Sequence, residues 1–436
     1  MKESPVAKAW IDAFQSLGYN TSADPYSGKS VGAYSNLASV DPRTKARSYS
    51  ATAYGAIARV RPGVHIITDV LAQQVLLEGS APNVTATGVK AILDGRQVTV
   101  KAKKEVIISA GVFNTPKLLE LSGIGNKDVL EKFNIPVVID NPNVGENLQD
   151  HLMTGLSFEV IDGVLTGDPL LRQEPDAIQA AMQMYAEHKA GPMTIGGIQS
   201  SAFMPVLAFT GADGQKTQEE LFNHHLAPAT RSDYHTAIRE ILQQPDETAC
   251  SMFIFLAQAN LHESAKSFVD GKHLPGNYLS MGVIQSCPFS RGHVHVSSAD
   301  PMEKPTIDPA YLSHPLDWEI LARNLLEVER LHKTEALSRY LKPDGRRNHP
   351  DAFLTDLESA MNYLRDTATT AYHCGGTAAM LPEKSGGVVN EKLIVYGTKN
   401  LRICDASIFP VIPRANPMTT VYAVAERAAD IIKSDT

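Results

Sequence analysis

The 436-residue sequence has few cysteines, no long hydrophobic run and no excess of positive charge. Its four cysteines stand far apart without a C-x-x-C pair, so they predict neither a zinc site nor a disulfide framework. The longest apolar stretches, such as residues 252–257, fall far short of the ~18 residues that a membrane-spanning helix needs. Lysine and arginine total 40 against 48 aspartate and glutamate residues, and a net charge of −8 argues against a nucleic-acid partner. The first residues lack the apolar core of a signal peptide, so no compartment is predicted.

What the chain does contain is an ordinary globular composition, with 43% hydrophobic and 20% charged residues. These proportions exclude a disordered or fibrous protein and allow a sizeable core. A length of 436 residues exceeds the usual ~100–200 residues of one domain. We therefore expect two closely connected domains or one large α/β fold.

The order of periodic segments predicts a mixed α/β (α+β) fold. A first helix presents Val6, Trp10 and Phe14 on one face, and turn-rich sequence follows it. Five short β-prone runs, from residues 64–67 to residues 105–109, predict a β-meander. The last run leads into a helix that Thr115 caps and Pro116 begins. The expected division is an irregular arm over 1–60, a meander-containing domain part over 61–154, a second domain over 155–370 and a C-terminal return to the first domain over 371–436.

The C-terminal segment carries the sharpest functional signal. A buried-strand pattern at residues 401–404 ends at Asp405, and open α/β sheets place ligand contacts at that end of a strand. Asn416 and Pro417 are the cap and first residue of a final helix whose apolar residues recur at helical period. We expect this helix to be packed inside, with its positive N-terminal end directed into the protein toward an anion or an electron-rich atom.

Three sequence blocks resemble the glucose-methanol-choline (GMC) oxidoreductases. They are residues 109–125, the run NVGENLQDH at residues 143–151, and the C-terminal segment with YHCGGT at residues 372–377 and NPMTT at residues 416–420. The resemblance runs over nearly the whole chain. It implies an incomplete Rossmann-like FAD domain with a β-meander, together with a substrate domain built on an antiparallel sheet covered by helices.

The resemblance also implies an FAD-dependent oxidation of an alcohol. His373 would take the hydroxyl proton of a small-molecule alcohol, Asn416 would hydrogen-bond the same oxygen, and a hydride would pass to flavin N5; oxygen or another acceptor would reoxidise the flavin. Imidazole suits the role of base because it titrates near neutral pH. The remaining cofactor contacts implied are the backbone at Pro417, Met418 and Thr419 near the flavin, Asp405 and Ala406 near the pyrophosphate and ribityl chain, and Ala72 beside the adenine.

The N-terminal strand, G-x-G-x-x-G turn and helix of such proteins have no counterpart here, so we expect a chain that lacks the N-terminal FAD-binding segment. Its sheet would then expose Ile107, Ile108, Val395 and Ile403. Three explanations stay open: a truncated product whose full form is the enzyme, a chain that pairs with a separate N-terminal polypeptide, and a shortened relative that serves as a non-redox binding or cyclisation scaffold. A further alternative is that the chain is an inactive fragment.

Two other groups of residues have side chains that could form a site. His293 and His295 share one strand face, but no carboxylate or thiol at suitable spacing completes a metal site, so none is predicted. His373 and Cys374 are adjacent, which leaves thiol catalysis as a weak alternative.

Overall fold

The structure is a computed structural model that describes residues 5–21, 31–206, 211–226, 232–244, 246–259 and 274–435. Residues 22–30 of the predicted irregular arm lie outside this part. The chain divides into two compact units, each assembled from three segments. Unit 1 comprises residues 1–65, 152–286 and 314–371, and unit 2 comprises residues 66–151, 287–313 and 372–436. The return of residues 287–313 to unit 2 was not predicted from the sequence.

Unit 1 is built on a six-stranded antiparallel sheet in the order β1-β9-β10-β11-β8-β14. The strands are β1 (Gly32–Ser35), β8 (Leu152–Glu159), β9 (Ile198–Met204), β10 (Cys250–Phe255), β11 (Tyr278–Gln285) and β14 (Thr369–Thr370). Every residue of β8 and β11 is buried, so both faces of the sheet are covered at these strands. An antiparallel sheet under helices is the arrangement predicted for the second domain, and this prediction is confirmed.

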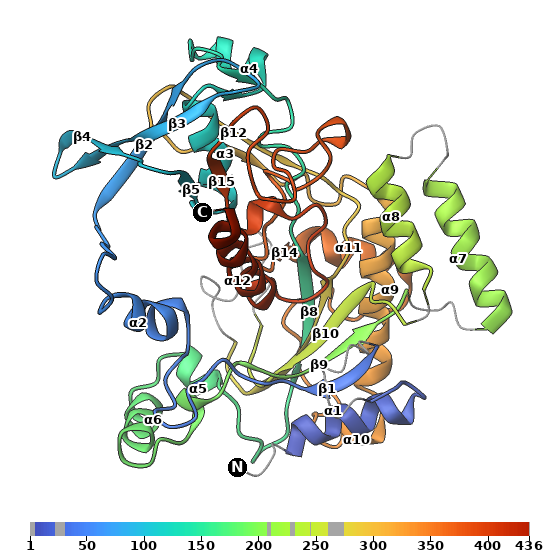
Figure 1. The fold of residues 1–436 in the computed structure, drawn as a ribbon. Coiled ribbons are helices and arrows are strands. Elements are labelled where there is room, and N and C mark those ends of the chain that lie inside the picture. Colours follow the sequence, from blue (N-terminus) through green and yellow to red (C-terminus); the bar gives the residue numbers. More distant parts are fainter. Residues whose placement is uncertain are drawn as a thin grey trace. The chain divides into compact units, whose positions relative to one another are not determined.

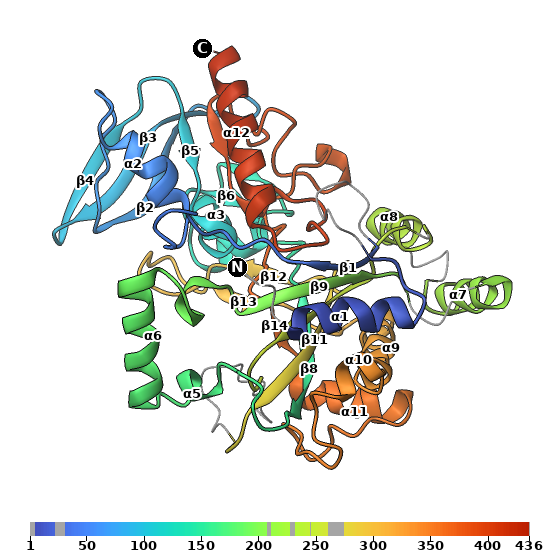
Figure 2. The same cartoon turned by 90° about the horizontal axis from the view of Figure 1, so that it is seen from below.

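The helices of unit 1 differ in their packing, and most of them contact the sheet or one another. They are α1 (Pro5–Ser16), α2 (Ala56–Ala58), α5 (Asp168–Leu171), α6 (Pro175–His188), α7 (Gly211–His225), α8 (Asp233–Leu242), α9 (Pro315–Leu331), α10 (Glu335–Ser338) and α11 (Leu357–Thr367), with a π-helical turn over Ala51–Gly55 and a 3₁₀ turn over Pro192–Thr194. Helix α1 lies along β1 and β9 (Figures 1 and 2), and the Trp10 indole N–H donates to Ser201 O of β9 at 3.3 Å. The predicted apolar face is confirmed, because Val6, Trp10 and Phe14 are all buried.

Unit 2 contains smaller sheets. The predicted meander is present as β2 (Val70–Glu78), β3 (Thr85–Leu93) and β4 (Arg96–Lys101), visible in blue and cyan in Figure 1. The other strands form pairs: β5 (Val106–Ile108) with β15 (Leu401–Ile403), β6 (Ile124–Gly125) with β7 (Ile139–Asp140), and β12 (His293–His295) with β13 (Thr306–Asp308). The strand predicted at residues 64–67 is wrong, since the meander begins only after Asp69, whose φ of 59° turns the chain into β2.

Unit 2 also contains α3 (Gly111–Leu121), α4 (Lys127–Lys132), α12 (Met418–Asp435) and 3₁₀ turns over Glu383–Ser385 and Ala406–Ile408. Its main core lies between the small sheets, α3, the Ala406–Ile408 turn and α12. The expected exposure of the parallel strands is wrong for Ile108, Val395 and Ile403, which are buried in this core. Only Ile107 is exposed, at 45% of its surface.

Helix α3 begins at Gly111, five residues before the predicted first residue, Pro116, so Pro116 lies inside the helix. Proline has no N–H to donate to the carbonyl four residues earlier, which is that of Val112. The Thr377 hydroxyl donates to Val112 O at 2.6 Å instead. A side chain from the C-terminal segment therefore satisfies the acceptor that the proline leaves, and the helix continues through it.

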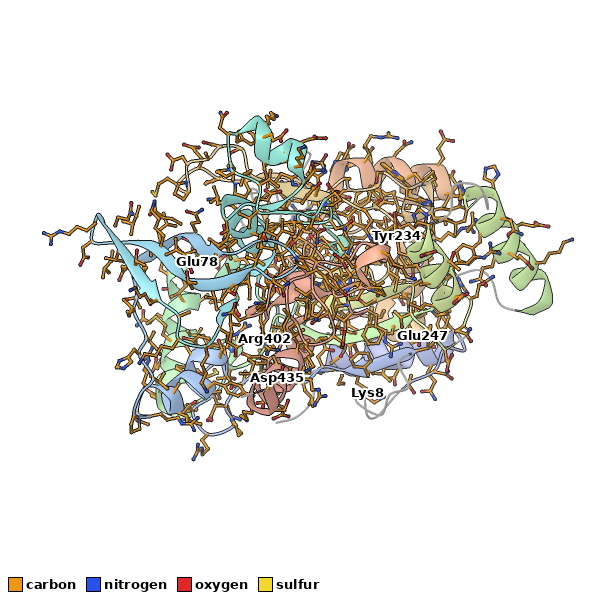
Figure 3. All side chains as sticks on the ribbon, turned by 45° about the horizontal axis from the view of Figure 1, so that its top comes forward. Lys8, Glu78, Tyr234, Glu247, Arg402 and Asp435 are labelled. Atoms are coloured by element: carbon orange, nitrogen blue, oxygen red, sulfur yellow. The ribbon has the colours of Figure 1, made fainter. Side chains whose placement is uncertain are left out.

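The final helix forms where it was predicted, but its predicted burial is wrong. Of the residues of α12, only Ala428 is buried, with Val421 and Val424 packed partly against the core of unit 2. The far end of the helix is fixed by charge: the buried Arg402 guanidinium donates to Asp435 Oδ2 at 2.9 Å and to Glu105 Oε2 at 2.6 Å. Figure 3 labels Arg402 and Asp435, which lie side by side. Among the described residues, no helix is both long and apolar enough to cross a membrane.

Candidate active site

His373 follows a strained turn in unit 2. Tyr372 adopts a φ of 61°, which is uncommon for a large side chain and persists only where the surroundings impose it. The surroundings here are backbone bonds: Gln149 and Gly375 donate their N–H groups to each other's carbonyl at 2.9 Å, and the His373 N–H donates to Asp150 Oδ1 at 2.9 Å. The loop that carries His373 is therefore held by the end of the NVGENLQDH segment.

The NVGENLQDH segment acts as a brace for two loops of the C-terminal segment. The Asn147 amide donates to Pro410 O at 3.2 Å and to Gly376 O at 3.3 Å. The Gln149 amide donates to Pro410 O at 3.1 Å and accepts from the Ile412 N–H at 3.2 Å. Because side-chain amides offer donors and an acceptor at fixed spacing, two of them can position loops that have no regular secondary structure.

The brace itself needs a glycine. Gly145 has a φ of 86°, and a Cβ placed on it would lie 2.1 Å from Val294 O and 2.9 Å from the His295 ring. Only glycine fits both the conformation and the space.

His373 and Asn416 meet, as the sequence predicts. Asn416 Nδ2 lies 2.9 Å from His373 Nε2, although Asn416 is exposed. On the other side of the ring, His151 Nδ1 lies 3.0 Å from His373 Nδ1, with the two rings edge to face at 89°. His151 is 1% exposed. Both nitrogens of His373 are thus engaged, one by the predicted partner and one by a histidine to which the sequence analysis assigned no role.

The Asp150 carboxylate fixes the backbone of His373 by a hydrogen bond. Its Oδ1 accepts the His373 N–H, and its Oδ2 accepts the Tyr311 hydroxyl at 2.5 Å. Burial lowers the pKa of His373 below its ordinary value, and the negative charge of Asp150 opposes that shift. His373 is therefore neutral at neutral pH and able to accept a proton.

The adjacent thiol is not activated. Burial, together with the nearby Asp150 carboxylate, raises the pKa of Cys374 to about 12. Since the thiolate is the nucleophilic form, a pKa this high argues against the alternative of thiol catalysis.

Asp405 and Ala406 lie at the end of β15, beside the His373 loop, where the Gly376 N–H donates to Ala406 O at 3.1 Å. The Asp405 carboxylate is fully engaged within the protein: it accepts from the Gly111 N–H at 2.9 Å, the Thr115 hydroxyl at 2.6 Å and the Ser407 N–H at 2.8 Å. Its side chain joins β15 to the start of α3.

The other predicted cofactor residues fall in two places. Met418 and Thr419 begin α12, and Pro417 lies between them and Asn416; the first bond of the helix runs from the Val421 N–H to Pro417 O. The N–H groups of Met418 and Thr419 precede that bond and have no acceptor within the helix. Ala72 lies in the meander, where it pairs with Ala91 of β3.

His295 has carboxylate partners that the sequence spacing did not reveal. Its Nδ1 lies 2.6 Å from Glu120 Oε1 and its Nε2 lies 3.0 Å from Glu146 Oε1. Although burial lowers the pKa of His295, hydrogen bonds to the two glutamates raise it to about 9. An imidazole with both nitrogens occupied by carboxylates has no lone pair for a metal, so this is an ion-pair cluster.

Two family models match the chain, and both describe a GMC oxidoreductase. The N-terminal model matches residues 1–153 and the C-terminal model matches residues 288–425. The chain belongs to the GMC oxidoreductase family. Because the N-terminal match begins at residue 1, the prediction that this GMC oxidoreductase lacks the N-terminal segment is not supported.

Curated relatives agree with this membership. A dehydrogenase of Monascus purpureus is 32% identical over 455 residues, which cover 99% of this chain and 71% of the relative. A versicolorin B synthase of Emericella nidulans is 30% identical over 428 residues, covering 97% of this chain and 61% of the relative. This GMC oxidoreductase chain therefore spans about two thirds of the length of such relatives.

Solved structures confirm the fold. An FAD-dependent oxidoreductase from Chaetomium thermophilum superposes with a TM-score of 0.82 at 26% identity, covering 99% of this chain and 72% of the other. A fungal aryl-alcohol oxidase gives a TM-score of 0.81 at 25% identity, with coverage of 99% and 71%. The mixed α/β prediction is thereby confirmed.

Proposed function

We propose that this chain carries the proton-accepting site of an FAD-dependent GMC oxidoreductase that oxidises a small-molecule alcohol to an aldehyde or ketone. The observation that supports the proposal is the convergence of the His373 imidazole and the Asn416 carboxamide, 2.9 Å apart. A base and a hydrogen-bond donor at this spacing can both reach one hydroxyl oxygen.

The residues present fit the electron-accepting end of FAD. The N–H groups of Met418 and Thr419, which have no acceptor within the helix, lie at its positive end just after Asn416, where they would stabilise negative charge on the flavin ring of a bound FAD. A Cβ on Gly111, just beyond the end of β5, would meet no atom within 4 Å, which leaves space at the strand ends for a ligand. FAD, when bound, supplies the acceptor for the hydride that leaves the substrate carbon.

The chain's own residues supply the proton chemistry. His373 Nε2 takes the hydroxyl proton, and this makes the hydride a better leaving group because negative charge builds on the oxygen. Asn416 then orients that oxygen by donating an amide N–H. The low pKa of His373 keeps the base unprotonated at neutral pH.

The test is anaerobic reduction of bound FAD by a panel of aliphatic and benzylic alcohols, followed by flavin absorbance. Both the chain and a version with an upstream G-x-G-x-x-G segment are loaded with FAD, because the sequence has no such motif. We expect His373→Ala to slow flavin reduction by ~10²-fold or more. His188→Ala is the matched control, since the His188 side chain is 70% exposed. Absence of flavin binding in both versions, or unchanged reduction in His373→Ala, contradicts the proposal.

A second candidate function is a non-redox scaffold that binds or cyclises its ligand. It is favoured by the relative whose name is a synthase and not an oxidoreductase. This reading predicts ligand binding or cyclisation without flavin. Alcohol-dependent bleaching of bound FAD separates the two candidates, because only the oxidoreductase produces it.

A further inference from the structure

The contact between His151 and His373 limits which of their ring nitrogens can carry a hydrogen. Their Nδ1 atoms are 3.0 Å apart, and both rings are turned so that these two nitrogens face each other. A hydrogen bond between two nitrogens needs one hydrogen and one lone pair. In the neutral pair, therefore, one Nδ1 carries a hydrogen and the other does not.

Asn416 decides which of them carries it. The Asn416 atom next to His373 Nε2 is the amide nitrogen, at 2.9 Å, and an amide nitrogen can only donate. Nε2 of His373 must then present its lone pair, so the hydrogen of the neutral ring is on Nδ1. His151 Nδ1 accepts that hydrogen, and the hydrogen of neutral His151 is on its Nε2. With the Asn416 amide in this orientation, the three side chains have one consistent assignment of hydrogens.

We propose that His151 is a positioning residue that holds His373 in the tautomer with a bare Nε2. This inference deepens the proposed function, because Nε2 is the atom assigned there to take the hydroxyl proton. His151 acts only through His373, by accepting its Nδ1–H.

The proton balance of the step involves both rings. The substrate O–H bond breaks, and its proton forms a bond to His373 Nε2, which makes that ring an imidazolium. The Nδ1–H of the imidazolium stays bonded to the lone pair of His151, as a stronger, charge-assisted bond. No second proton moves, and the positive charge lies beside the Asp150 carboxylate, which accepts the His373 backbone N–H.

Burial makes this acceptor hard to replace. His151 is 1% exposed, so little water can reach its position. If the acceptor were removed, the Nδ1–H of His373 would be left unpaired, and the ring would gain by moving its hydrogen to Nε2 once the Asn416 amide turns its oxygen toward that nitrogen. That tautomer directs a hydrogen, and not a lone pair, toward Asn416 and the substrate.

The test is nitrogen NMR of the chain with ¹⁵N-labelled histidine rings, because ring shifts distinguish the two neutral tautomers and report the pKa of each ring. It needs no flavin. The sequence has 14 histidines, and His373→Asn and His151→Asn assign the two signals. Wild-type His373 is expected as the Nδ1–H tautomer. The signal of His295, held as a cation between two glutamates, reports that unit 2 is folded in each variant.

Two substitutions separate acceptor loss from a change of packing. His151→Leu removes the lone pair, and we expect His373 to change to the Nε2–H tautomer with a pKa lower by about one unit. His151→Asn places an amide oxygen near the former Nδ1, and we expect the wild-type tautomer to return. His188→Leu, at an exposed position, should change neither signal.

In the FAD-loaded protein, His151→Leu should lower kcat by about tenfold with KM unchanged, and should shift the acid limb of the pH profile of kcat/KM to lower pH. His151→Asn should recover most of the loss. A wild-type His373 found as the Nε2–H tautomer overturns the proposal, as does a tautomer and pKa unaltered in both variants. If no alcohol reduces the flavin, the proposed function fails, while the tautomer measurement still decides the role of His151.

Discussion

Different interactions stabilise the fold of each unit. Unit 1 has one six-stranded sheet whose strands β8 and β11 are buried along their whole length. Unit 2 has sheets of two or three strands, and long-range side-chain bonds from Asn147, Gln149 and Asp405 join its loops. The candidate site lies in unit 2. The loop that carries His373 is fixed by side-chain amides and carboxylates, because strand pairing contacts this loop only at Gly375.

This comparison predicts that the two units respond to different substitutions, and the largest effect is expected in the apolar core of unit 1. Leu156 in β8 is fully buried opposite Met281 of β11. Leu156→Ala leaves a cavity and should lower the free energy of unfolding by about 3 kcal/mol. Denaturant titration measures this loss, and Leu156→Met, which conserves volume, should cost less than about 1.5 kcal/mol. Equal losses in both variants would show that packing is not the source.

The next effect concerns the polar ties of unit 2. Asp405→Ala removes the acceptor for two backbone N–H groups and the Thr115 hydroxyl, and should cost about 2 kcal/mol. Hydrogen exchange followed by mass spectrometry should show faster exchange in α3 and the Ala406–Ile408 turn, with strands β8 and β11 unchanged. Asp405→Asn keeps one oxygen and should lose less. Faster exchange spread evenly over both units would show that Asp405 does not act locally in unit 2.

The smallest effect is a pH dependence in the ion-pair cluster of unit 2. The folded-state pKa of His295 is about 9, above the 6.5 of an unperturbed histidine. The stabilisation is therefore complete below pH 6.5 and disappears as the pH rises through 9. After allowance for solvent screening it amounts to about 1 to 2 kcal/mol.

The measurement is the free energy of unfolding of wild type and His295→Gln between pH 6 and 10. The gap between the two proteins should narrow toward alkaline pH, whereas His188→Gln, at an exposed position, should show no gap. A gap that is constant with pH would mean that the charge on His295 contributes nothing.

Periodicity and capping predicted the elements whose formation depends on neighbouring residues in the sequence. The amphipathic α1, the meander and the start of α12 after Asn416 formed as expected, because periodicity and capping act over a few residues. The start of α3 was missed because Pro116 is normally a first helical residue, and the hydroxyl that satisfies Val112 comes from a distant segment. The burial of α12 was overestimated because the apolar face of a helix, read from the sequence, does not show whether another segment packs against it.

The candidate site was predictable in its main pair and not in its supports. The meeting of His373 and Asn416 followed from the family resemblance. His151 lay within the quoted NVGENLQDH block, yet nothing in the spacing of one sequence shows that residue 151 faces residue 373. The partners of His295 were missed for the same reason, since Glu120 and Glu146 lie well over a hundred positions away.

The proline inside α3 has a consequence for how substitutions combine. Restoring an ordinary residue at position 116 would return an amide hydrogen to Val112 O, and the Thr377 hydroxyl would then be a second donor to an oxygen already served. Loss of the Thr377 hydroxyl would leave Val112 O without a donor while residue 116 is proline, but would cost less once residue 116 has an amide hydrogen. The effect of a substitution at either position therefore depends on which of the two residues changes first.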